Sequence, residues 1–214
     1  MLKTLLAVTV ALQAVANPVG PIPVDREPQH RIAYADGALR VLQVNLPVGY
    51  TTLDHEHSHD LLTVNVENGP TRTRDGAGDW GAVRERAVGA VNVTEYTGRA
   101  ASHVVRVVGE KAYRLTGVEN VRATGWSTLP PIQDSAMAVM TESRAFRAYS
   151  LQLPNGASTT HIHAVPVVVV LLDGAVEVGS TALAERGAFA VVPAGQSHAV
   201  RAQRDVRAVE VEVR

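Results

Sequence analysis

Short segments of alternating or continuously apolar residues run through the chain, and they favour β-strands over helices. Positions 38–46 and 89–96 alternate loosely, and 208–213 has the sequence Ala-Val-Glu-Val-Glu-Val, which predicts a half-exposed strand. The run 165–172 is apolar apart from Pro166 and ends at Asp173 and Gly174, which predicts a buried strand. Helix signals are few, and only at 135–142 do we expect one short helix. The pattern predicts an all-β protein.

The two halves of the chain repeat one β unit. The segment 42–49 (Leu-Gln-Val-Asn-Leu-Pro-Val-Gly) is similar to 151–156 (Leu-Gln-Leu-Pro-Asn-Gly). Each is followed by a His-x-His pair, an apolar strand and a turn with glycine, and one more histidine comes later in each half. Two copies of one β unit predict two small antiparallel barrels.

Prolines place the boundaries of these barrels. Four prolines within 17–30 predict an extended lead-in over 17–37. Pro130 and Pro131 mark a linker over 127–134. The first barrel is therefore expected over 38–126 and the second over 135–214.

The N-terminus has the features of a secretory signal peptide. Lys3 gives a short positive start, a largely apolar run follows over 5–12, and Ala14-Val-Ala16 is a small-x-small cleavage site. The apolar run is too short to span a bilayer. We expect removal of 1–16 and export of the rest to the periplasm or the medium, with no membrane contact after the signal is removed.

Composition narrows the classes of function. Of the 214 residues 46% are hydrophobic but only 4% are aromatic, so the core must be built from Val, Leu and Ala. The formal net charge of −1 gives no field that would attract nucleic acid. Cysteine is absent, which excludes disulfides, thiolate metal ligands and cysteine nucleophiles. Chemistry must therefore come from other groups, and the 8 histidines are the obvious candidates.

The histidines lie at spacings that suit metal binding. His161 and His163 stand two residues apart, so on a strand they point to the same face. His198, from a neighbouring strand, can complete one side of a metal. In the first half the corresponding set is His55 and His57 with His103. Three neutral imidazoles suit Zn, Cu, Fe and Ni and leave positions open for water or substrate.

Two further residues of the first half leave alternatives open. His59 shares a face with His57, but the whole cluster also fits a solvated turn on the surface. Asp60 can be a fourth ligand only if its strand bulges; otherwise we expect it to orient an imidazole. Arg72, Arg74 and Arg106 can bind an anionic ligand, although solvated arginines are commoner.

The spacing of glycine, proline and histidine resembles the two conserved motifs of the cupin superfamily. Gly187, Pro193, Gly195 and His198 match the second motif. Gly49 precedes His55-x-His57 by the first motif's five residues, and the His161-x-His163 pair is followed by Gly174. The resemblance implies two tandem cupin-type double-stranded β-helix (jelly-roll) barrels, a bicupin. It also implies a divalent metal (Fe, Mn, Ni, Cu or Zn) at each inner mouth. The family's acidic ligand is absent, because its slots hold Leu62 and Val167.

Two functional hypotheses follow from this resemblance. The first is an exported metal-dependent dioxygenase or isomerase acting on a small organic substrate; no residue is identified as its catalytic acid or base. The alternative is a non-catalytic, degenerate cupin that serves as a small-ligand-binding or scaffold protein. A polar cavity around the histidines favours catalysis, whereas a barrel filled with Val and Leu favours a scaffold. Exposed strand edges, and the frequent pairing of cupins, favour a homodimer.

Overall fold

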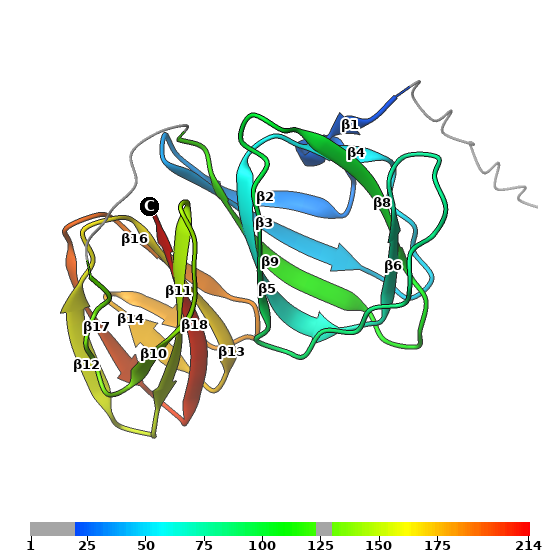
Figure 1. Ribbon diagram of the computed structural model, residues 1–214. Helices are drawn as coiled ribbons and strands as arrows, with labels where there is room; N and C mark the ends of the chain where they lie inside the picture. Colours follow the sequence, from blue (N-terminus) through cyan, green and yellow to red (C-terminus); the bar gives the residue numbers. More distant parts are fainter. Residues whose placement is uncertain (1–19, 123–129) are drawn as a thin grey trace, which may run out of the picture.

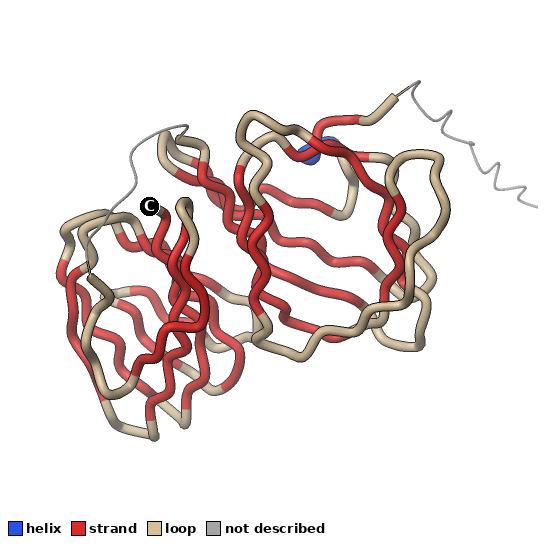
Figure 2. The backbone as a smooth tube through the Cα atoms, in the orientation of Figure 1, coloured by secondary structure: helices blue, strands red, loops and turns tan. Residues whose placement is uncertain are grey.

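The chain folds into two β-barrels that lie side by side (Figure 1), as the computed structural model shows for residues 20–122 and 130–214. Each barrel consists of a five-stranded sheet facing a four-stranded sheet. Strands account for almost all regular structure in these residues (Figure 2), and one 3-10 turn, η1 (Val24–Arg26), is the only helical element described. The prediction of an all-β chain with two tandem jelly-roll barrels is confirmed.

The first barrel contains strands β1 to β9. Its larger sheet has the order β2-β3-β9-β5-β7 and its smaller sheet the order β1-β4-β8-β6. The strands are β1 (Ile22–Pro23), β2 (His30–Ala35), β3 (Leu39–Leu46), β4 (His55–His57), β5 (Asp60–Asn68), β6 (Thr71–Arg74), β7 (Val91–Thr94), β8 (Ala101–Val107) and β9 (Tyr113–Asn120).

The second barrel contains β10 to β18 in a similar arrangement. Its sheets have the orders β10-β11-β18-β13-β16 and β12-β17-β14-β15. The strands are β10 (Met137–Glu142), β11 (Phe146–Leu153), β12 (Ser158–Ile162), β13 (Val167–Asp173), β14 (Val176–Val178), β15 (Thr181–Leu183), β16 (Phe189–Val192), β17 (Ser197–Ala202) and β18 (Val206–Val213).

The predicted short helix at 135–142 is wrong, because this segment forms β10. β10 pairs antiparallel with β11, from Met137 opposite Leu151 to Glu142 opposite Arg147. Pairing with an exposed sheet edge outweighs the weak helical preference of so short a segment.

The segment predicted as a lead-in takes part in the first barrel. β1 pairs in parallel with β4, with Ile22 opposite His55, and β2 pairs with β3 in the larger sheet. The predicted signal peptide and residues 127–129 of the predicted linker lie outside the described residues. No helix in the described ranges is long and apolar enough to cross a membrane.

A shared hydrophobic core joins the two barrels through their larger sheets. Leu39 and Leu62 from the first barrel and Phe146 and Val211 from the second belong to one buried cluster, and each is at most 1% exposed. Such a dry interface resembles a domain core and holds both barrels in one arrangement. The interiors of the barrels are separate from this cluster, and they are where the histidines lie.

Candidate metal centres

Strand pairing brings together the three histidines of the second barrel. His161, near the end of β12, lies directly opposite His198 of β17, and their ring centroids are 4.5 Å apart. His163 follows two residues after His161, so its ring returns to the same face, with the two centroids 5.0 Å apart. All three side chains are buried. The predicted same-face geometry is therefore present in the structure.

Glu210 of β18 supplies a carboxylate to this cluster. Its Oε2 lies 3.1 Å from His161 Nε2 and 3.2 Å from His163 Nε2. One ligand atom from each of the four residues lies within 4.8 Å of the others, so a single ion can bind them all. The slot in which the family carries its acid holds Val167, and the acid of this barrel comes instead from a different strand.

The last strand was also predicted to be half exposed, and this is wrong. β18 is a central strand of the larger sheet, one face of which packs in the core shared with the first barrel while the other lines the interior of the second barrel. Glu210 is 0% exposed and Glu212 is 6% exposed. The alternation of Val and Glu in 208–213 separates one apolar face from one polar face, and the polar face points into the barrel rather than into water.

Several buried polar atoms of this cluster have no partner. Both ring nitrogens of His198 and Oε1 of Glu210 are buried without a hydrogen bond. Burial raises the pKa of Glu210, but hydrogen bonds from His161 and His163 outweigh it and lower the pKa to about 2. A buried, ionised carboxylate beside unpartnered imidazole nitrogens is costly unless something cationic joins them. The donor set therefore fits a divalent metal with three nitrogen ligands and one oxygen ligand.

A chain of charged groups orients His163. Its Nδ1 lies 2.8 Å from Glu212 Oε1, and Arg147 Nη1 lies 3.2 Å from Glu212 Oε2. A carboxylate on Nδ1 fixes the imidazole so that Nε2 points toward the ligand site. Arg147 in turn forms a buried ion pair with Glu212.

The first barrel repeats the three-histidine arrangement. His55 of β4 lies opposite His103 of β8, with ring centroids 4.6 Å apart, and the ring of His57 lies 5.1 Å from that of His103. Ligand atoms of all three lie within 4.8 Å of one another. The Nδ1–H of His55 donates to the carbonyl of Leu53 at 2.9 Å, which leaves its buried Nε2 without a partner. The lone pair of Nε2 is therefore available to bind a metal.

Glu119 of β9 is the counterpart of Glu212 in this barrel. Its Oε2 lies 2.6 Å from Arg40 Nη2, and its Oε1 lies 3.9 Å from His57 Nδ1, longer than a hydrogen bond. The same Arg–Glu–His sequence of contacts thus occurs in both barrels, although it is looser in the first. Tyr96 stacks on the ring of His57 at 5.1 Å and adds a second restraint.

His30 is a fourth histidine of the first barrel, and it is not among the ligands predicted from the sequence. Its ring centroid lies 4.6 Å from that of His55. Burial, together with repulsion from His55, His57 and His103, lowers its pKa to about 2. Burial and repulsion from its neighbours likewise lower the pKa of His103 to about 3. These imidazoles are neutral at pH 7, the form that binds metals. The sequence feature that could have identified His30 is its position shortly before the first predicted strand of the repeat.

Asp60 and His59 lie outside the cluster. Asp60 Oδ1 accepts hydrogen bonds from the backbone N–H groups of Tyr96 and Thr97, at 2.8 and 2.7 Å. It therefore fixes the loop that carries Tyr96, and neither of the roles considered for it is found. Of the slots expected for the family's acid, Leu62 points into the core between the barrels and Val167 into the second barrel.

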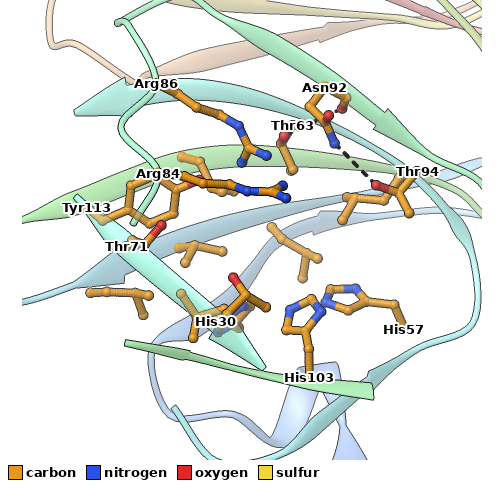
Figure 3. Close-up of a pocket in the computed structure, with 18 of the residues that line it drawn as sticks. His30, His57, Thr63, Thr71, Arg84, Arg86, Asn92, Thr94, His103 and Tyr113 are labelled. Atoms are coloured by element: carbon orange, nitrogen blue, oxygen red, sulfur yellow. Dashed lines mark hydrogen bonds between the residues drawn. The ribbon is translucent and has the colours of Figure 1, made fainter. Parts of the chain in front are cut away.

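The two barrels differ in the space beside their histidines. A cavity of about 510 Å³ opens beside His30, His57 and His103 in the first barrel. Figure 3 shows Arg84 and Arg86 extending over this cavity, with the rings of His57 and His103 on the far side. In the second barrel apolar side chains pack the interior instead. They include Leu151, Val167, Val169, Leu171, Val176, Leu183, Val200 and Val206.

Solved structures with this fold cover most of the chain. The bacterial pirin YhhW of Escherichia coli in complex with nickel(II) matches 86% of this chain and 90% of its own, with 14% identity and a TM-score of 0.62. AerE from Microcystis aeruginosa matches 88% of this chain and 98% of its own, with 11% identity and a TM-score of 0.61. The chain has the bicupin fold.

A third match is an enzyme of the same architecture. Salicylate 1,2-dioxygenase from Pseudaminobacter salicylatoxidans matches 82% of this chain and 71% of its own, with 12% identity and a TM-score of 0.60. No protein-family model matches the chain, and no curated protein matches its sequence. At these identities the bicupin fold is shared, while the chemistry has to be argued from the two histidine clusters.

Proposed function

We propose that this bicupin is a metal-dependent enzyme whose reaction takes place in the first barrel. The observation that carries the proposal is the cavity of about 510 Å³ that opens onto the histidine cluster there. A cavity of this size accommodates a small organic molecule. Its walls combine polar groups with apolar ones, which is the setting expected for catalysis rather than for a scaffold.

His55, His57 and His103 would hold the metal of the first barrel. Three neutral nitrogen ligands leave coordination positions open toward the cavity. A bound Fe, Mn, Ni, Cu or Zn ion would supply Lewis acidity, and Fe, Mn or Cu would also supply redox chemistry toward dioxygen. The hydroxyls of Thr63 and Thr94 line the cavity and can orient a substrate by hydrogen bonding.

His161, His163, His198 and Glu210 would hold a second metal with a structural role. These four ligands are buried and the barrel interior beside them is filled, so a substrate has no space there. A carboxylate and three imidazoles provide four ligands for a divalent ion, so few coordination positions remain for water. The support for a resident metal is the set of unpartnered buried atoms on His198 and Glu210.

The solved structures suggest which reaction to test first. One match is a salicylate 1,2-dioxygenase, and a structure of that enzyme is described as containing gentisate. We infer that dioxygenation of a small organic substrate is the reaction to test first, with isomerisation as the other metal-assisted possibility. The nickel(II) in the pirin structure supports a transition metal in a barrel of this kind.

Oxygen consumption tests the proposal. The protein is loaded in turn with Fe²⁺, Mn²⁺, Ni²⁺, Cu²⁺ or Zn²⁺ and supplied with gentisate or salicylate. We expect metal-dependent turnover that is lost in the His55→Ala/His57→Ala variant and kept in the His161→Ala/His163→Ala variant. The absence of oxygen uptake and of product with every metal would contradict the dioxygenase assignment.

A binding protein without catalysis is the second candidate. The first-barrel cluster has no acidic ligand, since Gly117 stands where the second barrel carries Glu210. A metal held by three histidines can bind a ligand without transforming it. Ligand binding in the absence of turnover would favour this candidate.

We further propose that the protein is exported after removal of residues 1–16. The charged start, the apolar run and the Ala14-Val-Ala16 site support this proposal. The mass of the protein recovered from the periplasm or the medium of expressing cells tests it. A mature chain that begins at Asn17 is expected, and a retained Met1 would contradict export.

A further inference from the structure

We propose that the first-barrel cavity binds an organic carboxylate and that Arg84 and Arg86 hold its carboxylate group. This inference rests on the proposed function, because it places the substrate between these arginines and the histidine cluster. Figure 3 shows the two guanidinium groups directed into the same space as the rings of His57 and His103. A molecule that fills this space meets cations at one end and the histidines at the other.

The backbone conformation explains why both arginines point into the cavity. They stand at i and i+2 of an extended segment, so their side chains leave on the same side. Arg84 forms an antiparallel bridge with Thr71, with its N–H donating to the carbonyl of Thr71 at 2.8 Å and its carbonyl accepting at 2.9 Å. Val83 and Glu85, the alternate positions, are exposed and do not line the cavity.

The side chain of Asn65 holds the segment with Arg84 and Arg86 in place. Its buried side-chain amide donates to the carbonyls of Arg86 and Ala87, at 2.6 and 3.2 Å. Its backbone carbonyl also accepts from the N–H of Gly89 at 2.8 Å. The arginines therefore stand on a braced backbone rather than on a free loop, which lowers the entropy cost of binding.

The charges in the cavity favour an anion. Among the described residues no carboxylate lies within ion-pair distance of Arg84 or Arg86, while Arg86 lies close to the hydroxyl of Tyr113. In the lining of the cavity Asp75 is the only acid described. Two adjacent guanidinium groups without a carboxylate partner form a fork that matches a carboxylate in shape and charge.

The apolar residues that line the cavity indicate that the rest of the ligand is apolar. The residues that line the cavity also include Leu42, Leu61, Val93, Val105 and Leu115. Such walls disfavour sugar phosphates and inorganic phosphate, which would leave polar groups without partners. The combination favours a small aromatic or aliphatic carboxylate.

Calorimetry with matched pairs of ligands tests this proposal on the full chain. Salicylate is compared with salicylamide, and benzoate with benzamide, because each amide keeps the shape and loses the charge. We expect each carboxylate to bind about tenfold or more tightly than its amide, the effect of charge-assisted hydrogen bonds. The Arg84→Gln/Arg86→Gln variant should lose this preference.

A second pair of arginines provides a control for the loss of net charge away from the proposed site. Arg72 and Arg106 face each other on β6 and β8, and neither lines the cavity. The Arg72→Gln/Arg106→Gln variant loses the same net charge and should keep the preference for carboxylates. Equal binding of carboxylate and amide, no binding of either, or a preference that survives in the Arg84→Gln/Arg86→Gln variant would overturn the proposal.

Metal analysis of the same samples keeps this inference distinct from the proposed function. The His55→Ala/His57→Ala variant should keep part of its preference for carboxylates, because the arginines remain in place. If that variant binds salicylate but the wild type shows no metal, the enzyme assignment fails and the anion site stands. If metal and turnover are present but only uncharged substrates react, the anion site fails.

Discussion

Glu210 of the second barrel and Gly117 of the first occupy the same position in the repeated β unit. Glu210 lies opposite Val169 of β13, and Gly117 lies opposite Thr63 of β5. Val169 and Thr63 each stand six residues after the second histidine of their His-x-His pair. The repeat thus carries an acid in one copy and no side chain in the other, which gives one barrel a fourth ligand and leaves the other more space.

Replacing Glu210 should weaken metal binding in the second barrel. In a His55→Ala/His57→Ala background only the second site remains to be measured. Glu210→Gln removes the charged oxygen that faces His161 and His163, and we expect the metal affinity to fall by at least about tenfold, as for other losses near a metal. Competition with a chromogenic chelator measures this, and an unchanged affinity would exclude Glu210 as a ligand.

Glu212 should act through His163 and not through the metal itself. Glu212→Gln loses the charge that orients the imidazole, and we expect metal affinity in the second barrel to fall by roughly 10- to 100-fold. Glu177 forms an exposed ion pair with Arg201 on the same barrel, so Glu177→Gln is a matched control and should have no effect. Equal effects of the two substitutions would argue against an orienting role.

Glu27 should stabilise the loop before the first His-x-His pair. It is 1% exposed and accepts hydrogen bonds from the hydroxyl of Tyr50 and the N–H of Leu53, each at 2.8 Å. Glu27→Ala leaves both donors without a partner, which should lower the free energy of unfolding by about 2–4 kcal/mol. Urea unfolding measures this change. Asp25→Ala, at an exposed neighbour, should stay within about 0.5 kcal/mol of the wild type.

The core between the barrels should make them unfold together. Phe146 is fully buried in the cluster that both larger sheets share. Phe146→Ala should cost about 3–5 kcal/mol through lost burial and the cavity that remains. Val139, on the exposed face of β10, provides a control in Val139→Ala. A single cooperative transition in calorimetry is expected for the wild type, and two independent transitions would contradict a shared core.

The fold and the histidines were predictable from local pattern. Alternation, glycine turns and the repeated His-x-His unit are short-range features, and they determined the strands and the face on which His55 and His57 or His161 and His163 lie. The partners His103 and His198 followed from the same repeat. The helix expected at 135–142 failed because sheet pairing, a long-range effect, decides so short a segment.

The rest of each site depends on contacts between distant strands. Glu210 and Glu212 lie on the last strand, and they point inward because Val209, Val211 and Val213 on its other face pack in the core between the barrels, which alternation alone does not reveal. His30 reaches its cluster through the pairing of β2 with β3. Arg84 and Arg86 lie outside the predicted strands, whereas the arginines considered from the sequence, Arg72, Arg74 and Arg106, do not line the cavity.

Elemental analysis of purified protein shows whether each barrel holds a metal ion. Metal is measured in residues 17–214 and in the His55→Ala/His57→Ala and His161→Ala/His163→Ala variants, after reconstitution with each candidate ion. Two histidine clusters, one in each barrel, predict one bound ion per barrel and the loss of one equivalent in each variant. Protein that holds no metal in any preparation would contradict metal binding by either cluster and leave a two-barrel protein whose histidines serve another purpose.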